Sequence, residues 1–241
     1  LKMQKKVAPY IKRIITPSKS SKQGIVDEFN CKKANITVIN NGIDTNEFSP
    51  VNEVTRNEFR LITTASADVP LKGLDFSLKA LKKLKKDFPN MHLIVIGLIK
   101  KGGHTEKLIK KLGLENDVTF KSNLTKNEIK DCYSKSSIAI VSSLYEGFGY
   151  PVIEAMSCEV PLIATNVSSI PELTSEFAKL VDPKNEEMIY QSVKDILAEY
   201  DKYKKIAIKG RQHVIKNFNW IKITGEYENA IFETIKNFKK C

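Results

Sequence analysis

Residues 137–165 read "SIAIVSSLYEGFGYPVIEAMSCEVPLIAT", and this stretch decides the fold. It begins with the apolar run 137–143 and ends with a second apolar run, 161–165. Continuous apolar runs of this length are typical of buried strands. Between them a turn leads into "YPVIEAMSC", where Pro151 suits the start of a helix because its missing N–H costs nothing there. The stretch therefore predicts a strand, a helix and a second strand in succession.

The same alternation of strand and helix extends outward, from residue 59 to about residue 197. The predicted strands are continuous apolar runs, which is typical of parallel sheets that helices cover on both faces. We therefore expect an α/β fold, a doubly wound parallel sheet with helices on both faces and a Rossmann-like topology. Its strands are predicted at residues 59–66, 91–97, 118–120, 137–143, 161–165 and 178–181.

Both ends of the chain carry further elements. We expect short strands at residues 11–16 and 36–39, with a helix between them that begins near Ser18 or Ser20. The last helix has apolar residues at positions 220, 223, 227, 231, 235 and 238. This stripe requires a partner surface, either on the same domain or on something that the chain only partly contains.

Composition limits the classes of partner and the compartment. The net charge is +11, but the arginines, which read guanine and phosphate bidentately, are few, so we expect no nucleic acid and instead attraction to an anionic membrane. The four cysteines are scattered and no run of 18 apolar residues occurs. We expect a cytoplasmic protein, peripheral at the inner face of the membrane. Since the first residue is Leu1, we also expect a piece of a longer chain.

The turn after the strand 137–143 has the features of a ligand cradle. Ligands of doubly wound sheets bind at the carboxyl ends of the strands. Gly147 and Gly149 allow a ligand to approach the backbone closely. The N–H groups around residues 148–152 open a helix, whose dipole favours an anion by roughly 0.3–1 kcal/mol per charge. The turn therefore predicts an anion-binding site.

Two carboxylates flank this cradle, Glu146 in the loop and Glu154 about one turn into the helix. A carboxylate that accepts hydrogen bonds from two vicinal hydroxyls suits a ribose, each charged bond contributing roughly 1.5–3 kcal/mol. On spacing alone the alternative stays open that Glu146 is a solvated loop residue and Glu154 a solvated helix residue.

The segment "YEGFGYPVIEAMSCEVPLIAT" resembles the E-x7-E segment of the family-4 retaining glycosyltransferases of the GT-B fold. Other motifs of that family follow in the same order along the chain. "ITVINNGIDTNEFSP" at 36–50 is similar to the end of its N-terminal domain, and "VPLKGLDFSLKAL" at 69–81 to its Lys-Gly phosphate loop. "SSIPEL" at 168–173 and "FNW" at 218–220 resemble its Pro-Glu loop and the start of its last helix.

The resemblance implies roles for individual residues. Glu146 is implied to be the catalytic carboxylate, in contact with the donor sugar, and Glu154 to hold the ribose hydroxyls. Main-chain N–H groups in the loop would face sugar and phosphate, and Lys72 would neutralise the diphosphate. Since no D-x-D pair occurs, we expect no metal and no cofactor. The donor-binding set consists of Lys72, Gly147, Phe148, Gly149 and Glu154.

The resemblance also implies an activity and a domain division. We expect transfer of a sugar from a nucleotide sugar to an acceptor glycan or lipid-linked glycan, with retention at the anomeric carbon, in polysaccharide or glycolipid biosynthesis. Residues 1–56 would be a remnant of the N-terminal acceptor domain with a linker. Residues 57–217 would form the Rossmann-like donor-binding domain, and residues 218–241 a helix that packs back toward the N-terminal part.

Some positions depart from the family pattern. Ser66 and Ala67 stand where an arginine is frequent, and Ser168 and Ser169 stand where glycines are common. These departures put tight diphosphate binding and the contact of the second loop with the donor in doubt. Because most of an acceptor domain is missing, a non-catalytic nucleotide-sugar-binding fragment or subunit is the alternative. A nucleotide-sugar epimerase of the same fold is a third reading.

Overall fold

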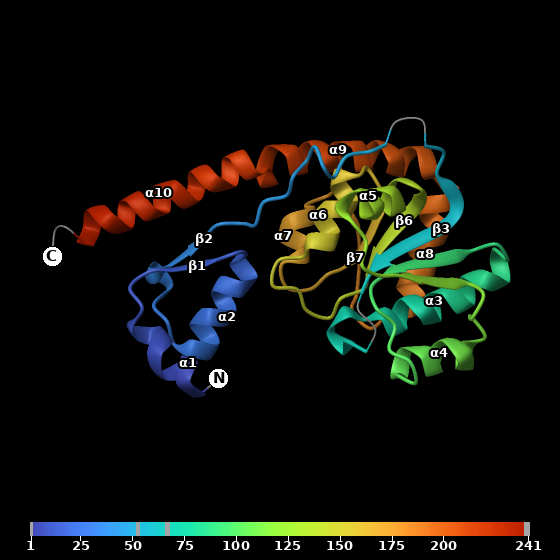
Figure 1. Cartoon of the computed structure of the whole chain (residues 1–241), viewed down its shortest axis with the longest axis horizontal. Coiled ribbons are helices and arrows are strands. Elements are labelled where there is room, and N and C mark those ends of the chain that lie inside the picture. The colour runs from blue at the N-terminus through green and yellow to red at the C-terminus, as the bar shows by residue number, and fades with distance from the viewer. Residues whose placement is uncertain (1, 52–53, 66–67, 239–241) are drawn as a thin grey trace.

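A computed structural model describes residues 2–51, 54–65 and 68–238 of the chain (Figure 1). Its centre is a six-stranded sheet in the order β5-β4-β3-β6-β7-β8, in which every neighbouring pair is parallel. The chain therefore winds outward from β3 in one direction and from β6 in the other, and the direction reverses between these two strands. The strands are β3 (Asn57–Thr64), β4 (His92–Ile96), β5 (Val118–Lys121), β6 (Ser136–Val141), β7 (Leu162–Thr165) and β8 (Lys179–Val181).

Helices cover both faces of this sheet, as two separate apolar clusters show. Successive residues of β3 point to opposite faces: Leu61 packs in one cluster and Ile62 in the other. On the Leu61 side lie α3 (Leu74–Asp87), α4 (His104–Leu112) and α8 (Glu186–Ala198). On the Ile62 side lie α5 (Lys126–Ser134), α6 (Tyr150–Ser157), α7 (Ile170–Thr174) and α9 (Tyr200–Phe218). The predicted doubly wound α/β fold is confirmed.

Local sequence signals explain where these helices begin and end. In α3, leucines recur at helical spacing and are fully buried, whereas lysines occupy the remaining positions. Helix α5 begins with a capping box, in which Thr125 and Glu128 bond each other's backbone N–H. Helix α4 ends at Gly113, whose φ of +64° suits glycine.

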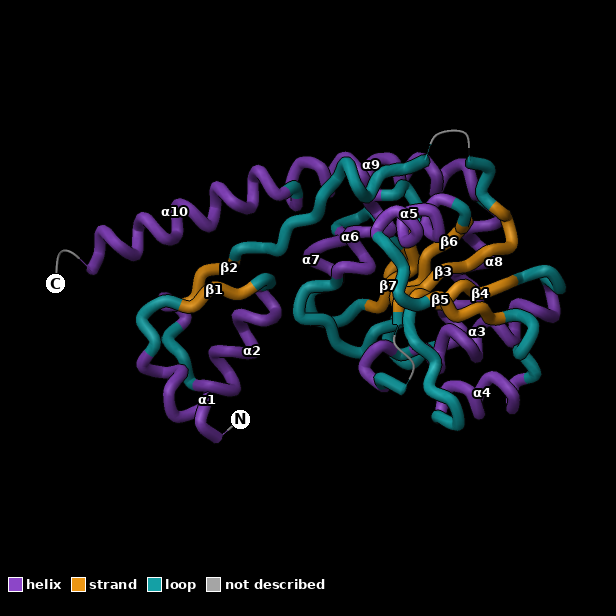
Figure 2. The backbone as a smooth tube through the Cα atoms, in the orientation of Figure 1, coloured by secondary structure: helices purple, strands orange, loops and turns teal. Residues whose placement is uncertain are grey.

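The N-terminal part forms a second, smaller unit (Figure 2). Strands β1 (Ile14–Thr16) and β2 (Ile36–Val38) pair in parallel as a separate two-stranded sheet. Around them lie α1 (Lys2–Val7), α2 (Lys19–Phe29) and the 3-10 turns Ala8–Tyr10 and Lys33–Asn35. The sequence pattern predicts neither α1 nor α7. Both helices are short, so neither shows a full period of apolar residues.

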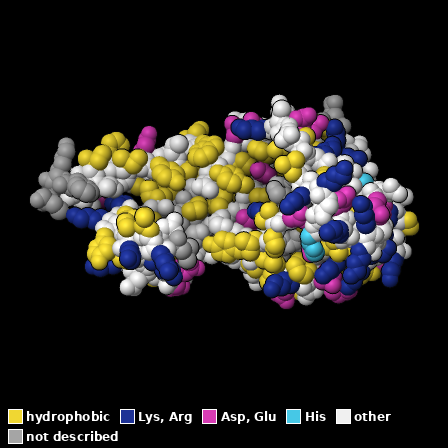
Figure 3. Space-filling view, turned by 60° about the horizontal axis from the view of Figure 1, so that its bottom comes forward, with side chains coloured by type: hydrophobic (Ala, Val, Ile, Leu, Met, Phe, Trp, Pro, Cys, Tyr) yellow, Lys and Arg dark blue, Asp and Glu magenta, His cyan; other side chains and the backbone are white. Residues whose placement is uncertain are grey.

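The last helix, α10 (Trp220–Phe238), runs from the end of α9 back to this unit. Ile223 and Ala230 are buried against Ile39, so part of the apolar stripe has a partner surface. Tyr227 packs against the same cluster, whereas Trp220, Ile231 and Ile235 are exposed, and Figure 3 shows hydrophobic side chains gathered on this half of the molecule. None of the helices in the described residues is long and apolar enough to cross a membrane.

Candidate active site

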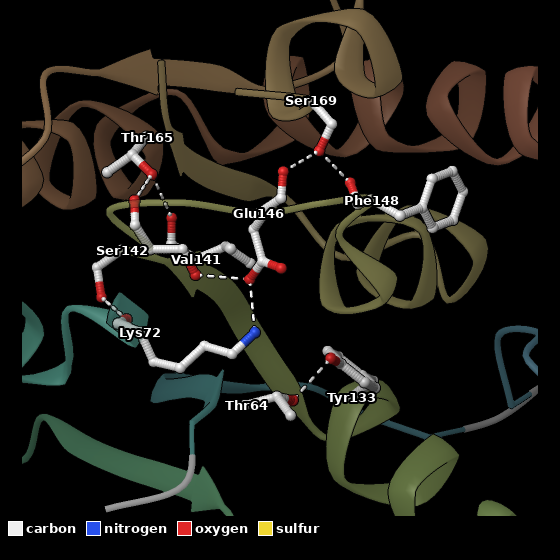
Figure 4. Close-up of polar contacts among 10 residues, drawn as sticks. Thr64, Lys72, Tyr133, Val141, Ser142, Glu146, Phe148, Thr165 and Ser169 are labelled. Carbon is white, nitrogen blue, oxygen red and sulfur yellow. Dashed lines mark hydrogen bonds and ion pairs between the residues drawn. The ribbon is translucent and has the colours of Figure 1, made fainter. Parts of the chain in front are cut away.

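The site lies where the strand order reverses, between β3 and β6. The loops that leave these two strands meet there, although they are more than 70 residues apart in the sequence. Lys72 ends a 3-10 turn, Pro70–Lys72, in the loop after β3, and Glu146 lies in the loop after β6. The Lys72 ammonium and Glu146 Oε1 form an ion pair of 2.7 Å (Figure 4). The structure therefore brings together two predicted site residues that sequence spacing could not join.

A clamp between the two loops fixes the position of Lys72. The Leu144 N–H donates to Leu71 O at 2.7 Å, and Ser142 Oγ donates to Gly73 O at 2.9 Å. Gly73 has φ +64°, and a Cβ on it would lie 1.9 Å from Ser142 O. Only glycine allows this approach, because the obstructing atom belongs to the backbone. Steric constraints thus explain the Lys-Gly pair of the motif, because the glycine allows the lysine to reach the point where the strand order reverses.

Glu146 is buried, with only 8% of its surface exposed. Its Oε1 accepts hydrogen bonds from Lys72 Nζ and from Ser143 Oγ, both at 2.7 Å. The Ser143 carbonyl is held in turn by the hydroxyl of Thr165 at the end of β7. The alternative reading of Glu146 as a solvated loop residue is therefore wrong. The sequence did not predict a role for Ser143 or Thr165, because isolated hydroxyl residues have no distinguishing pattern.

Glu154 lies one turn into α6 and is partly buried. Its Oε2 accepts a hydrogen bond of 3.1 Å from the Tyr133 hydroxyl, which also lies 3.1 Å from Thr64 Oγ1 at the end of β3. Burial raises the pKa of the Glu154 carboxyl above its ordinary value, and the hydrogen bond from Tyr133 opposes that rise. Glu154 is thus no solvated helix residue either. Tyr133, which sequence reasoning missed, orients it.

Residues 147–149 join the two carboxylates and present their main chain. Within the described part of the chain, the N–H groups of Gly147, Phe148 and Gly149 have no hydrogen-bond acceptor. Gly149 requires glycine because its φ is +112°, whereas a Cβ on Gly147 would meet only Ser21 Oγ, at an ordinary contact distance of 3.9 Å. The Phe148 ring is buried and packs edge-on against Phe218, with 6.1 Å between centroids. Phe148 can therefore offer a ligand only its backbone.

Two further predictions concern charge and metals. Ser66 and Ala67, which replace the frequent arginine, lie outside the described residues. Among the residues that the structure does describe, no group of three or more His, Cys, Asp or Glu side chains could hold a metal ion. The positive groups that the described site offers to an anion are therefore the Lys72 ammonium, the free N–H groups of the loop and the N-terminus of α6.

Comparison with known proteins identifies relatives of the chain. The sequence profile described as "Glycosyl transferases group 1" matches residues 46–213. The chain is 32% identical over 238 residues to MMP alpha-(1->4)-mannosyltransferase of Mycolicibacterium hassiacum, covering 96% of this chain and 57% of that protein. It is 30% identical over 185 residues to the O-antigen chain mannosyltransferase RfbU of Salmonella typhimurium, covering 77% of this chain and 51% of that protein.

The fold is likewise similar to that of solved structures. A glycosyltransferase from Rickettsia africae superimposes with a TM-score of 0.83 at 25% identity, covering 98% of this chain and 68% of that one. The chain spans little more than half the length of the curated relatives that it matches.

Proposed function

The chain belongs to the glycosyl transferases group 1, as its motifs predict, and we propose that residues 57–217 bind the nucleoside-diphosphate sugar that such an enzyme uses as donor. The observation that carries the proposal is the Lys72–Glu146 ion pair at the strand-order reversal, beside three main-chain N–H groups that have no acceptor among the described residues. The protein would transfer the donor sugar to an acceptor with retention at the anomeric carbon.

The diphosphate would lie against Lys72 and the start of α6. As the bond between sugar and phosphate breaks, negative charge develops on the leaving nucleoside diphosphate. The Lys72 ammonium, the free N–H groups of the loop and the dipole of α6 are fixed before the reaction and would stabilise that charge. We propose that these groups act without a metal ion, so chelators should leave donor binding unchanged.

The two carboxylates would contact different parts of the donor. Glu146, which Lys72 and Ser143 hold in place, would face the sugar as the catalytic carboxylate. Glu154 keeps Oε2 on Tyr133, so its other oxygen is available to the ribose hydroxyls. A hydrogen bond to a charged group contributes roughly 1.5–3 kcal/mol, which corresponds to about a 10- to 100-fold change in affinity.

The relatives suggest which sugar to test first. Two of them are named mannosyltransferases, so we propose a hexose donor with mannose as the leading candidate. The acceptor would be a glycan or a lipid-linked glycan. Contact with an anionic membrane would follow from the net charge of +11.

Calorimetric titration of the 241-residue chain with GDP, UDP, GDP-mannose and UDP-glucose tests the proposal. We expect one of these to bind, and Glu154→Ala to weaken that binding about 10- to 100-fold. Glu115→Ala, which changes an exposed carboxylate in the turn before β5, is the matched control and should bind like the parent. Equal affinity of Glu154→Ala and the parent would show that the ribose role is wrong.

A second candidate is a non-catalytic nucleotide-sugar-binding module. The chain spans only 57% of the length of the mannosyltransferase it resembles, which favours this alternative for the chain on its own. Product analysis after incubation with donor and candidate acceptors separates the two. Sugar transfer by the 241-residue chain alone would exclude the non-catalytic module.

A further inference from the structure

Ser169 holds the donor loop from behind. It lies at the N-terminus of α7 and is fully buried. Its Oγ is 2.9 Å from the Glu146 carbonyl oxygen and also within hydrogen-bond distance of the Phe148 carbonyl oxygen. The hydroxyl carries one proton, so the two carbonyls share it. Figure 4 shows Ser169 on the opposite side of this loop from Lys72.

The direction of these carbonyls fixes the direction of two amides. In a planar trans peptide unit the C=O and the following N–H point in opposite directions. The carbonyls of Glu146 and Phe148 share their peptide units with the N–H groups of Gly147 and Gly149. With both carbonyls turned to Ser169, both amides turn away from it, toward the side of the loop where Lys72 lies.

The peptide unit between these two is held from another element. The Gly147 carbonyl accepts hydrogen bonds from Ser18 Oγ at 2.8 Å and from Ser21 Oγ at 2.9 Å, both at the start of α2. Next to them, the Glu172 carboxylate accepts from the backbone N–H groups of Lys19 and Ser20, at 3.1 and 3.2 Å. The start of α2 is therefore seated on the donor loop and on α7.

We propose that Ser169, Ser18 and Ser21 are positioning residues for the donor diphosphate, and that the loop has its binding shape only while α2 is seated on it. The inference rests on the proposed function and deepens it. Three successive peptide units are held by hydroxyls, and amides that are oriented in advance lose less entropy when an anion binds. The hydroxyls that hold them come from serines, so each can be removed by a single substitution to alanine.

The first experiment compares Ser169→Ala with Ser137→Ala. Ser137 is an equally buried serine in β6, with Oγ 2.8 Å from Glu58 O and 3.0 Å from Arg60 O, away from the site. Both variants lose a hydroxyl shared by two carbonyls, so both should lose similar thermal stability. Only Ser169→Ala should bind the nucleoside diphosphate more weakly, by about tenfold.

Amide NMR gives a readout that stability alone would not move. On addition of the nucleoside diphosphate, the amide protons of Gly147 and Gly149 should shift downfield in the parent and in Ser137→Ala. In Ser169→Ala these shifts should be much smaller. Unchanged shifts and unchanged affinity in Ser169→Ala would overturn the inference.

The second experiment tests the seating of α2. Glu172→Gln removes the charge that holds the α2 N–H groups, and Ser18→Ala/Ser21→Ala removes both bonds to Gly147. Each should weaken diphosphate binding about five- to tenfold, whereas Ser20→Ala, at a neighbouring position in α2, should not. If these variants bind like the parent, the role of α2 is wrong. A parent chain that binds no nucleotide would instead overturn the proposed function itself.

Discussion

Gly73→Ala should be among the most damaging single substitutions in the chain, although it adds one methyl group. The new Cβ would lie 1.9 Å from Ser142 O and 2.9 Å from Ser142 C, so the backbone must move. That backbone is held by the bonds from Ser142 Oγ to Gly73 O and from Leu144 N–H to Leu71 O. Relief of the overlap therefore breaks the clamp that places Lys72.

The destabilisation expected for Gly73→Ala has two contributions. A φ of +64° costs alanine roughly 1–2 kcal/mol more than glycine, and overpacking against fixed atoms adds about 1–3 kcal/mol. We expect Gly73→Ala to lower the free energy of unfolding by about 2–5 kcal/mol. For a chain of this size that is a fall in Tm of about 4 to 20 °C. Urea unfolding followed by circular dichroism measures the first quantity, and a thermal scan the second.

Two other glycines separate the backbone cost from the overpacking cost. Gly102 has φ +72° and nothing within 4 Å of a Cβ, so Gly102→Ala should show the backbone cost alone, about 1–2 kcal/mol. Gly24 lies in α2 with open space and an ordinary φ, so Gly24→Ala should stabilise by about 0.5–1 kcal/mol. The reasoning would be refuted if Gly73→Ala were no more destabilising than Gly102→Ala.

Three further predictions concern other described contacts. Ser168 has φ +49°, a backbone conformation that is strained for serine, so Ser168→Gly should leave the free energy of unfolding unchanged or raise it by up to about 1 kcal/mol in urea unfolding. A clear loss of stability would show that Ser168 is not strained. Arg56 donates to the carbonyls of Tyr133, Ser136, Cys158 and Glu159, so Arg56→Met should cost about 2–4 kcal/mol. Arg60→Met, which removes no hydrogen bond to a described residue, should stay within 0.5 kcal/mol in the same assay. Finally, since the pKa of Glu154 is raised above its ordinary value of 4.5, nucleotide affinity should rise with pH above that value as the carboxylate forms, while this group's contribution to folding stability falls. Tyr133→Phe removes the hydrogen bond that opposes the rise, so the midpoint of this pH dependence should move to higher pH in calorimetric titrations. An unmoved midpoint would contradict the assigned role of Tyr133.

Much of the fold could be predicted because its central strands β6 and β7 are buried at every position. Runs such as Ile138–Val141 are apolar at every position, so a strand and a parallel sheet follow directly from the sequence. The short elements were missed for the opposite reason, since α1 and α7 have fewer residues than two helical turns. Their placement depends on tertiary contacts, as with Ile170 in the core.

The site could be predicted only in part. The two carboxylates and the glycines are local in sequence, and the strand-turn-helix pattern places them at a sheet edge. The partner of each carboxylate is not local: Glu146 contacts Lys72 from 74 residues away, and Glu154 contacts Tyr133 of α5, the helix that precedes β6 in the chain. A serine that donates to a backbone carbonyl has no recognisable sequence spacing, so the contacts of Ser18, Ser21 and Ser169 with the loop could not be predicted.

The Lys72–Glu146 ion pair also determines which part of a ligand lies at each of its two charged groups. Lys72 has three N–H donors and Glu146 accepts one of them at 2.7 Å, so the ammonium can still bind an anion. Glu146 is buried and held by Ser143, so it cannot move aside for that anion. Two like charges 4 Å apart repel by about 4 kcal/mol at an effective dielectric constant of 20, unless a cation lies between them. A diphosphate is therefore favoured where the Lys72 ammonium and the loop N–H groups shield it from the Glu146 carboxylate, and the carboxylate is left to a group that is neutral or that gains positive charge. On the proposed function that group is the sugar at its anomeric carbon, which puts phosphate at Lys72 and the transferred carbon at Glu146.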